Sequence, residues 1–143
     1  MTLGALTWLS GAAYAASPES AALGECLIGK TTGEDRLLLA RWMTFAFAAH
    51  PDVQDAVTLD RSALPDTDQR VADLVMALLA DRCNAEAKAA VAAEGNAAIA
   101  FEAAFQMLGT IAAEEAMRDP GVATAINGFV SHVDEAALRD ALD

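Results

Sequence analysis

The sequence is poor in the residue types that build β-sheets and bind nucleic acids. Aromatic residues make up 6% of the chain, and β-branched residues do not cluster into the alternating runs from which strands are built. Lysine and arginine number 9 against 21 aspartates and glutamates. Because phosphate groups are bound by clustered basic residues, we predict no nucleic-acid partner. The net charge of −12 is interpreted as an aid to solubility, with a cationic partner as the alternative.

Histidine and cysteine are also scarce, which leaves little material for a metal centre or for acid–base catalysis. His50 and His132 lie outside any Glu-x-x-His pattern of the di-iron type. Neither cysteine has a second ligand at metal-binding spacing. Four glutamates are interpreted as a solvated helix face: Glu94, Glu102, Glu114 and Glu115. We therefore predict no metal, no cofactor and no catalytic residue, and a binding module rather than an enzyme.

What the chain does contain is alanine, which supplies much of its 55% hydrophobic content. Alanine is the best helix former because it loses no side-chain entropy in a helix. Apolar residues recur at helical spacing between glycines and prolines. At 143 residues the chain is long enough for one domain with a buried core. We predict a compact all-α bundle of six or seven short helices with one disulfide, in which residues 16–143 form a single helical domain.

Glycine and proline also set the expected helix boundaries. A first helix is predicted to follow Ser17 as its N-cap and to stop near Gly29. The next helix, residues 32–50, has a narrow polar stripe and is expected to be the central helix, buried on most sides. Further helices are predicted for an amphipathic segment that ends at Cys83 and for residues 85–94, 97–117, 122–133 and 135–142.

Residues 1–15 are predicted to be a secretion signal. A short apolar run is followed by Ala13-Tyr14-Ala15, which places small residues at the two positions that a signal peptidase reads. The run is too short to span a bilayer. The segment lacks the lysine or arginine that normally precedes such a run, so a buried N-terminal helix is the alternative. The mature chain would begin at Ala16, in the periplasm or outside the cell.

The two cysteines agree with export. In an oxidising compartment the simplest outcome is a structural disulfide between Cys26 and Cys83. Closing a loop of this length would stabilise the fold by about 4 kcal/mol in the chain-entropy model. Two separate buried thiols are the alternative.

Residues 24–31 match the pattern G-x-x-x-x-G-K-T of phosphate-binding loops. In such loops backbone amides surround the phosphates, the lysine neutralises them and the hydroxyl binds magnesium. The pattern requires a buried strand before it, whereas the residues before Gly24 are predicted to be helical. We interpret the match as incidental and keep a nucleotide-binding enzyme as the alternative function.

Two further groups of residues are candidate sites. The turn Thr32, Asp35 and Arg36 is predicted to cap a helix, with Thr32 and Asp35 exchanging hydrogen bonds as in a capping box. Four aromatic residues either line a pocket for a small apolar ligand or simply belong to the core: Trp42, Phe45, Phe101 and Phe105.

Four elements of the segment 26–51 form a distinctive pattern: Cys26-Leu27, Thr31-Thr32-Gly33-Glu34-Asp35-Arg36, Leu39-Ala40-Arg41-Trp42 and Ala49-His50-Pro51. In this pattern the segment resembles a group of small exported proteins of proteobacteria without an assigned activity. The resemblance implies an exported location and a helical fold, and it implies no mechanism. We therefore predict a periplasmic or secreted helical module that binds an unknown protein or a small apolar ligand and has no stable membrane span.

Overall fold

Helices and the turns between them make up residues 16–143, the part of the chain that the computed structural model describes. Eight α-helices lie in this part, and it contains no strand. The predicted all-α class with one disulfide is confirmed. The predicted secretion signal, residues 1–15, lies outside the described residues.

The first three helices begin where proline or a capping side chain favours helix initiation. Helix α1 (Pro18–Gly29) is capped by the Ser17 side chain, which accepts a hydrogen bond from the Ser20 amide, as the sequence predicted for Ser17. Helix α2 (Gly33–Phe47) follows Thr32. The single turn α3 (Pro51–Gln54) follows, with Pro51 at its first position.

The middle of the chain forms three longer helices. Helix α4 (Leu64–Met76) follows a short 3₁₀ turn (Arg61–Ala63) and continues into a π-helical turn (Ala77–Arg82). Helix α5 (Asn84–Glu94) ends at Gly95, whose φ of 67° is the left-handed conformation that glycine adopts without steric cost. Helix α6 (Ala97–Met117) is capped by the Asn96 side chain.

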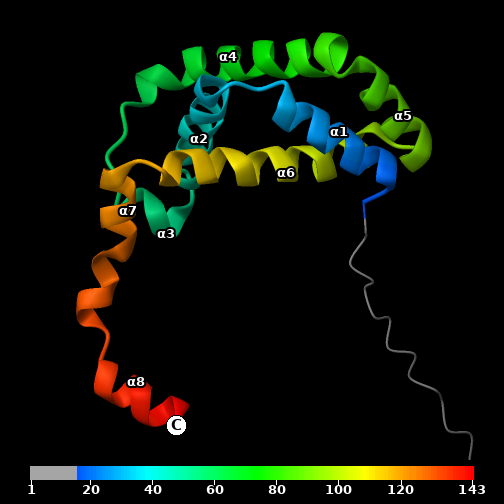
Figure 1. Ribbon diagram of the computed structural model, residues 1–143. Helices are drawn as coiled ribbons and strands as arrows, with labels where there is room; N and C mark the ends of the chain where they lie inside the picture. Colours follow the sequence, from blue (N-terminus) through cyan, green and yellow to red (C-terminus); the bar gives the residue numbers. More distant parts are fainter. Residues whose placement is uncertain (1–15) are drawn as a thin grey trace, which may run out of the picture.

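Helix α6, rather than α2, is the central helix of the molecule, because it packs against α1, α2 and α5 (Figure 1). Its buried positions recur every four residues and are nearly all alanine, namely Ala100, Ala104, Leu108 and Ala112. Such small side chains let the neighbouring helices approach closely. The remaining core is supplied largely by leucines of α1, α2, α4 and the π-helical turn: Leu23, Leu27, Leu38, Leu39, Leu74 and Leu78.

The prediction that α2 is buried on most sides is wrong. Only Leu38, Leu39 and Phe45 of α2 are buried, whereas Leu37 and Phe47 are 50% and 68% exposed. Apolar side chains occupy most of the surface of α2, but this helix packs chiefly against α6 and α4 among the described helices. The residues that face away from both of these helices therefore remain in contact with solvent.

The disulfide joins α1 to the end of the π-helical turn. The Cα atoms of Cys26 and Cys83 lie 6.0 Å apart, and 57 positions separate the two residues in the sequence. The Cys83 amide donates a hydrogen bond to the Leu78 carbonyl, five residues earlier. This wider turn ends the helix with the fully buried Cys83 facing α1.

The last part of the chain leaves the helical body as an arm. It consists of α7 (Pro120–Asn127), a 3₁₀ segment (Gly128–His132) and α8 (Glu135–Leu142). Figure 1 shows the arm running away from α6, with the C-terminus far from the other helices. None of its residues is buried, so the core lies wholly within residues 16–119 of the described chain.

Candidate functional site

The predicted turn between α1 and α2 is built around a capping box. The Thr32 hydroxyl accepts a hydrogen bond from the Asp35 amide at 3.1 Å, and an Asp35 carboxylate oxygen accepts one from the Thr32 amide at 2.9 Å. Two otherwise unpaired donors at the start of α2 are therefore satisfied.

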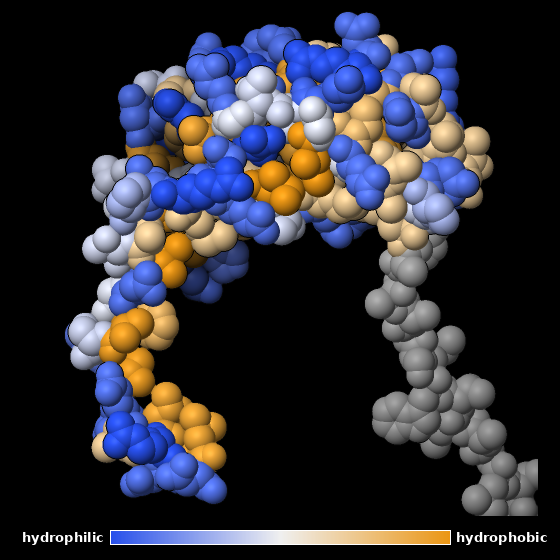
Figure 2. All heavy atoms as spheres, viewed as in Figure 1, coloured by the Kyte–Doolittle hydropathy of each residue, from blue (hydrophilic) through white to orange (hydrophobic). Residues whose placement is uncertain are grey.

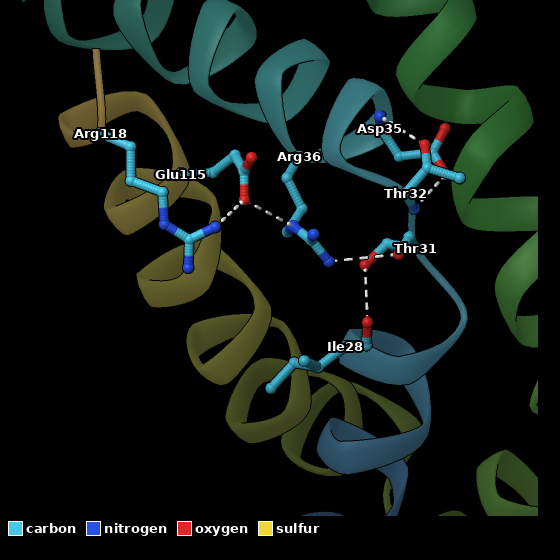
Figure 3. Close-up of polar contacts among 7 residues, drawn as sticks. All are labelled: Ile28, Thr31, Thr32, Asp35, Arg36, Glu115 and Arg118. Atoms are coloured by element: carbon cyan, nitrogen blue, oxygen red, sulfur yellow. Dashed lines mark hydrogen bonds and ion pairs between the residues drawn. The ribbon is translucent and has the colours of Figure 1, made fainter. Parts of the chain in front are cut away.

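Arg36 extends this turn into a contact between three helices (Figure 3). Its Nη1 donates to the Thr31 carbonyl at 3.2 Å, and its Nε lies 3.4 Å from Glu115 Oε2 on α6, an ion pair without hydrogen-bond geometry. Arg118 donates to the same Glu115 oxygen at 2.8 Å. Gly33 leaves room for this carboxylate, since a Cβ at Gly33 would lie 3.2 Å from Glu115 Oε1. These contacts hold the turn against α6.

Two of the four glutamates expected on a solvated helix face are engaged within the fold, so that expectation is wrong for them. Glu115 is paired with two arginines, and its side chain is only 20% exposed. Glu94, at the end of α5, accepts hydrogen bonds from the Ser17 amide at 3.0 Å and from the buried Ser20 hydroxyl at 2.9 Å. It therefore ties the start of α1 to α5.

The phosphate-loop pattern of residues 24–31 lies on the second half of α1 and the residues just after it. The Thr31 hydroxyl, which would bind magnesium in a phosphate loop, donates to the Ile28 carbonyl at 3.0 Å. The Lys30 amide closes the helix by bonding to the Cys26 carbonyl. Because these groups complete a helix end, no open ring of amides is formed here for a phosphate.

Gly24 has a packing role of its own. A Cβ at this position would overlap the Met107 sulfur on α6, so glycine permits the close contact between α1 and α6. Gly29, the second glycine of the pattern, has open space around it and a negative φ. The two glycines thus differ in what they do for the fold, and the contacts favour no phosphate-binding role.

The four aromatic pocket candidates do not line a common cavity. Trp42 and Phe105 border a cavity of about 90 Å³ between α2 and α6, whereas Phe45 borders a separate one beside the loop after α3. Phe101 is partly buried against the core. Trp42 is also fixed by its indole N–H, which donates to the Asp68 carboxylate on α4 at 3.0 Å.

The cavity beside Phe45 has a polar rim. It measures about 360 Å³ and is bordered by charged side chains of Arg41 and Asp60 as well as by Leu59. The Ser62 hydroxyl and the Ser62 amide both donate to the Asp60 carboxylate, and together with the nearby Arg41 they hold the pKa of Asp60 below its usual range. Asp60 is exposed to solvent, so the cavity lacks the buried polar group that typically fixes a small ligand.

The residues of 16–143 contain no group of three or more histidine, cysteine, aspartate or glutamate side chains placed to hold a metal ion. In the same part of the chain, no helix combines the length and the apolarity that a bilayer crossing requires.

The arm carries several large apolar side chains that are exposed to solvent. Its exposed side chains follow one another along α7, the 3₁₀ segment and α8, and Figure 2 shows apolar atoms gathered there, uncovered by the body. Phe129 is 64% exposed and Leu142 is 77% exposed. We define the arm face as these seven residues: Val122, Ile126, Phe129, Val130, Val133, Leu138 and Leu142.

The sequence predicts the helical spacing of the arm face, but it does not predict that this face is exposed. An apolar stripe predicts an amphipathic helix, and the simplest expectation is that the stripe packs into the bundle. The Asp119 side chain caps α7 by accepting from the Gly121 and Val122 amides, and Pro120 begins the new helix. This break after α6 redirects the chain away from the body. In the sequence, the pair Asp119-Pro120 is the signal that indicates this change of direction.

Comparison with protein-family models, with curated proteins and with solved structures finds no match to this chain. The resemblance of residues 26–51 to small exported proteins therefore stays a prediction.

Proposed function

We propose that the protein is an exported binding module, periplasmic or secreted, that docks a protein partner through the arm face. The observation that carries this proposal is the exposure of seven large apolar side chains on a segment without a buried residue. Exposed apolar surface gathered on one segment typically marks a site of interaction. Because the arm adds no buried residue to the core, its apolar side chains are better explained by binding to a partner than by stabilisation of the fold.

The shape of the arm favours a protein over a small molecule. Small ligands bind in enclosed cavities that bury most of their surface. The arm face is an extended ridge of helical segments, which suits the groove or helix of a macromolecule. An enzymatic role has less support, because Glu94, Glu115 and Arg36 serve the fold. Asp60, which borders a cavity beside Arg41, is exposed to solvent.

Export is supported by the predicted signal and by the disulfide, since such bonds form and persist in oxidising compartments. Intact-mass spectrometry of the protein from a periplasmic fraction tests it. The expected mass corresponds to a chain that starts at Ala16 and gains about two hydrogens on reduction. A full-length chain with free thiols would contradict the proposed export.

Site-specific photo-crosslinking in cells tests the docking role of the arm. A photoreactive phenylalanine analogue replaces Phe129 in the arm face or, as a matched control, Met76 on α4. The two positions are 64% and 63% exposed, so accessibility alone predicts equal labelling. We expect a discrete protein adduct from position 129 and none from position 76. Equal adducts from both positions, or none from position 129, would contradict the proposal.

A further inference from the structure

We infer that the partner of the arm face presents a basic amphipathic helix, an inference that rests on the proposed function. The arm offers apolar side chains at helical spacing, which is the pattern by which one helix recognises another. The charged residues around these side chains indicate the chemical class of the partner.

Carboxylates dominate the arm. Residues 119–143 contain a single arginine, Arg139, and no lysine, and five acidic residues: Asp119, Asp134, Glu135, Asp140 and Asp143. On α8, Glu135 precedes Leu138 by three residues and Leu142 by seven. At helical spacing these three side chains lie along one side together with Arg139, so a carboxylate and a guanidinium border the apolar face. Asp140 and Asp143 keep the charge of α8 negative.

The residues that lead into the arm do not reverse its negative charge. Arg118, directly before the arm, donates to Glu115 at 2.8 Å, so its charge is already paired. Glu114, on the same turn of α6, is exposed to solvent.

This charge pattern decides between three occupants of the arm face. A second copy of the chain would bring another net charge of −12 against the arm, and an anionic bilayer would likewise be repelled. A basic amphipathic helix instead places apolar residues on the arm face and lysines or arginines against the bordering carboxylates. Its binding is therefore both apolar and salt-dependent.

Two synthetic peptides test the inference with the full chain. One is a helical peptide of leucine and lysine, and the other is identical except that glutamate replaces lysine. Fluorescence anisotropy is expected to give saturable binding of the basic peptide, weakened by added salt, and at least about tenfold weaker binding of the acidic one. Equal affinity for both peptides would overturn the inference.

Substitutions separate docking on the arm face from simple attraction between opposite charges. Phe129→Asp adds negative charge, so pure attraction predicts tighter binding of the basic peptide, whereas docking predicts about tenfold weaker binding. Ile99→Asp, at a 38% exposed position on α6, is the matched control and is expected to leave the affinity unchanged. Glu135→Lys is expected to weaken the binding of the basic peptide and to reduce the salt dependence of that binding. Tighter binding by Phe129→Asp would overturn the inference.

The remaining occupants are tested on the same protein. A dimer in sedimentation that is lost in Phe129→Asp would identify a second copy of the chain, instead of a basic helix, as the occupant of the arm face. Flotation of the protein with phosphatidylglycerol vesicles would identify a membrane as the occupant. A crosslink at position 129 together with equal peptide affinities would overturn the charge inference and leave the proposed function standing. The absence of that crosslink would contradict both.

Discussion

At the residue scale, the turn between α1 and α2 concentrates the polar contacts of the fold. Thr32→Ala removes the hydroxyl that caps the Asp35 amide, and it is expected to lower the free energy of unfolding by about 1 kcal/mol. Chemical denaturation of the oxidised protein measures this. Thr44→Ala, which removes an exposed hydroxyl bonded within α2, is the control and should change little. An unchanged stability of Thr32→Ala would point to a role for the turn outside the fold.

Asp60 supplies a pH-dependent test at the same scale. Its pKa is lowered first by the Ser62 hydroxyl, then by the Ser62 amide and by Arg41. A carboxylate with a lowered pKa stabilises the fold above its ordinary pKa, and this stabilisation is lost as pH falls through the folded-state pKa. Ser62→Ala should raise the pKa of Asp60 toward its ordinary range, although the hydrogen bond from the backbone amide of residue 62 remains. An NMR titration of Asp60 that is unchanged in Ser62→Ala would contradict this account.

At the element scale, the contact between α1 and α6 depends on Gly24. Gly24→Ala forces the Met107 side chain to move, and we expect it to lower the free energy of unfolding by about 1–2 kcal/mol. Gly29→Ala is the matched control within the same helix, where open space and the helix propensity of alanine predict equal or slightly higher stability. Equal stability of the two variants, measured by urea denaturation, would rule out the packing role.

The elements themselves were largely predictable because their signals are local. Ser17 as the N-cap of α1, Gly95 as the stop of α5 and the break at Asp119-Pro120 each depend on the backbone preferences of a few residues. The π-helical turn before Cys83 was not predictable from local residues, since it depends on the placement of Cys83 in the core and in the disulfide with Cys26.

At the scale of the whole molecule, sequence periodicity could not identify which apolar faces are covered. Helix α2 has the larger apolar side chains, yet α6 is central because its alanines admit three neighbouring helices. The aromatic residues proposed for one pocket are divided between two cavities and the core, because their spacing in the sequence does not reveal which helix each of them faces. The arm face, like the exposed side of α2, has the periodicity of a packed helix without the packing.

As we propose it, the arm face stands open in the isolated protein and is covered by the partner. Hydrogen–deuterium exchange of the purified, oxidised full chain measures this most directly. Helices without tertiary packing open with little free energy. We therefore predict that amides of α7 and α8 exchange orders of magnitude faster than those of α1 and α6. Protection of the arm equal to that of α6, in a protein that sediments as a monomer, would show that the arm packs within the monomer and does not stand open.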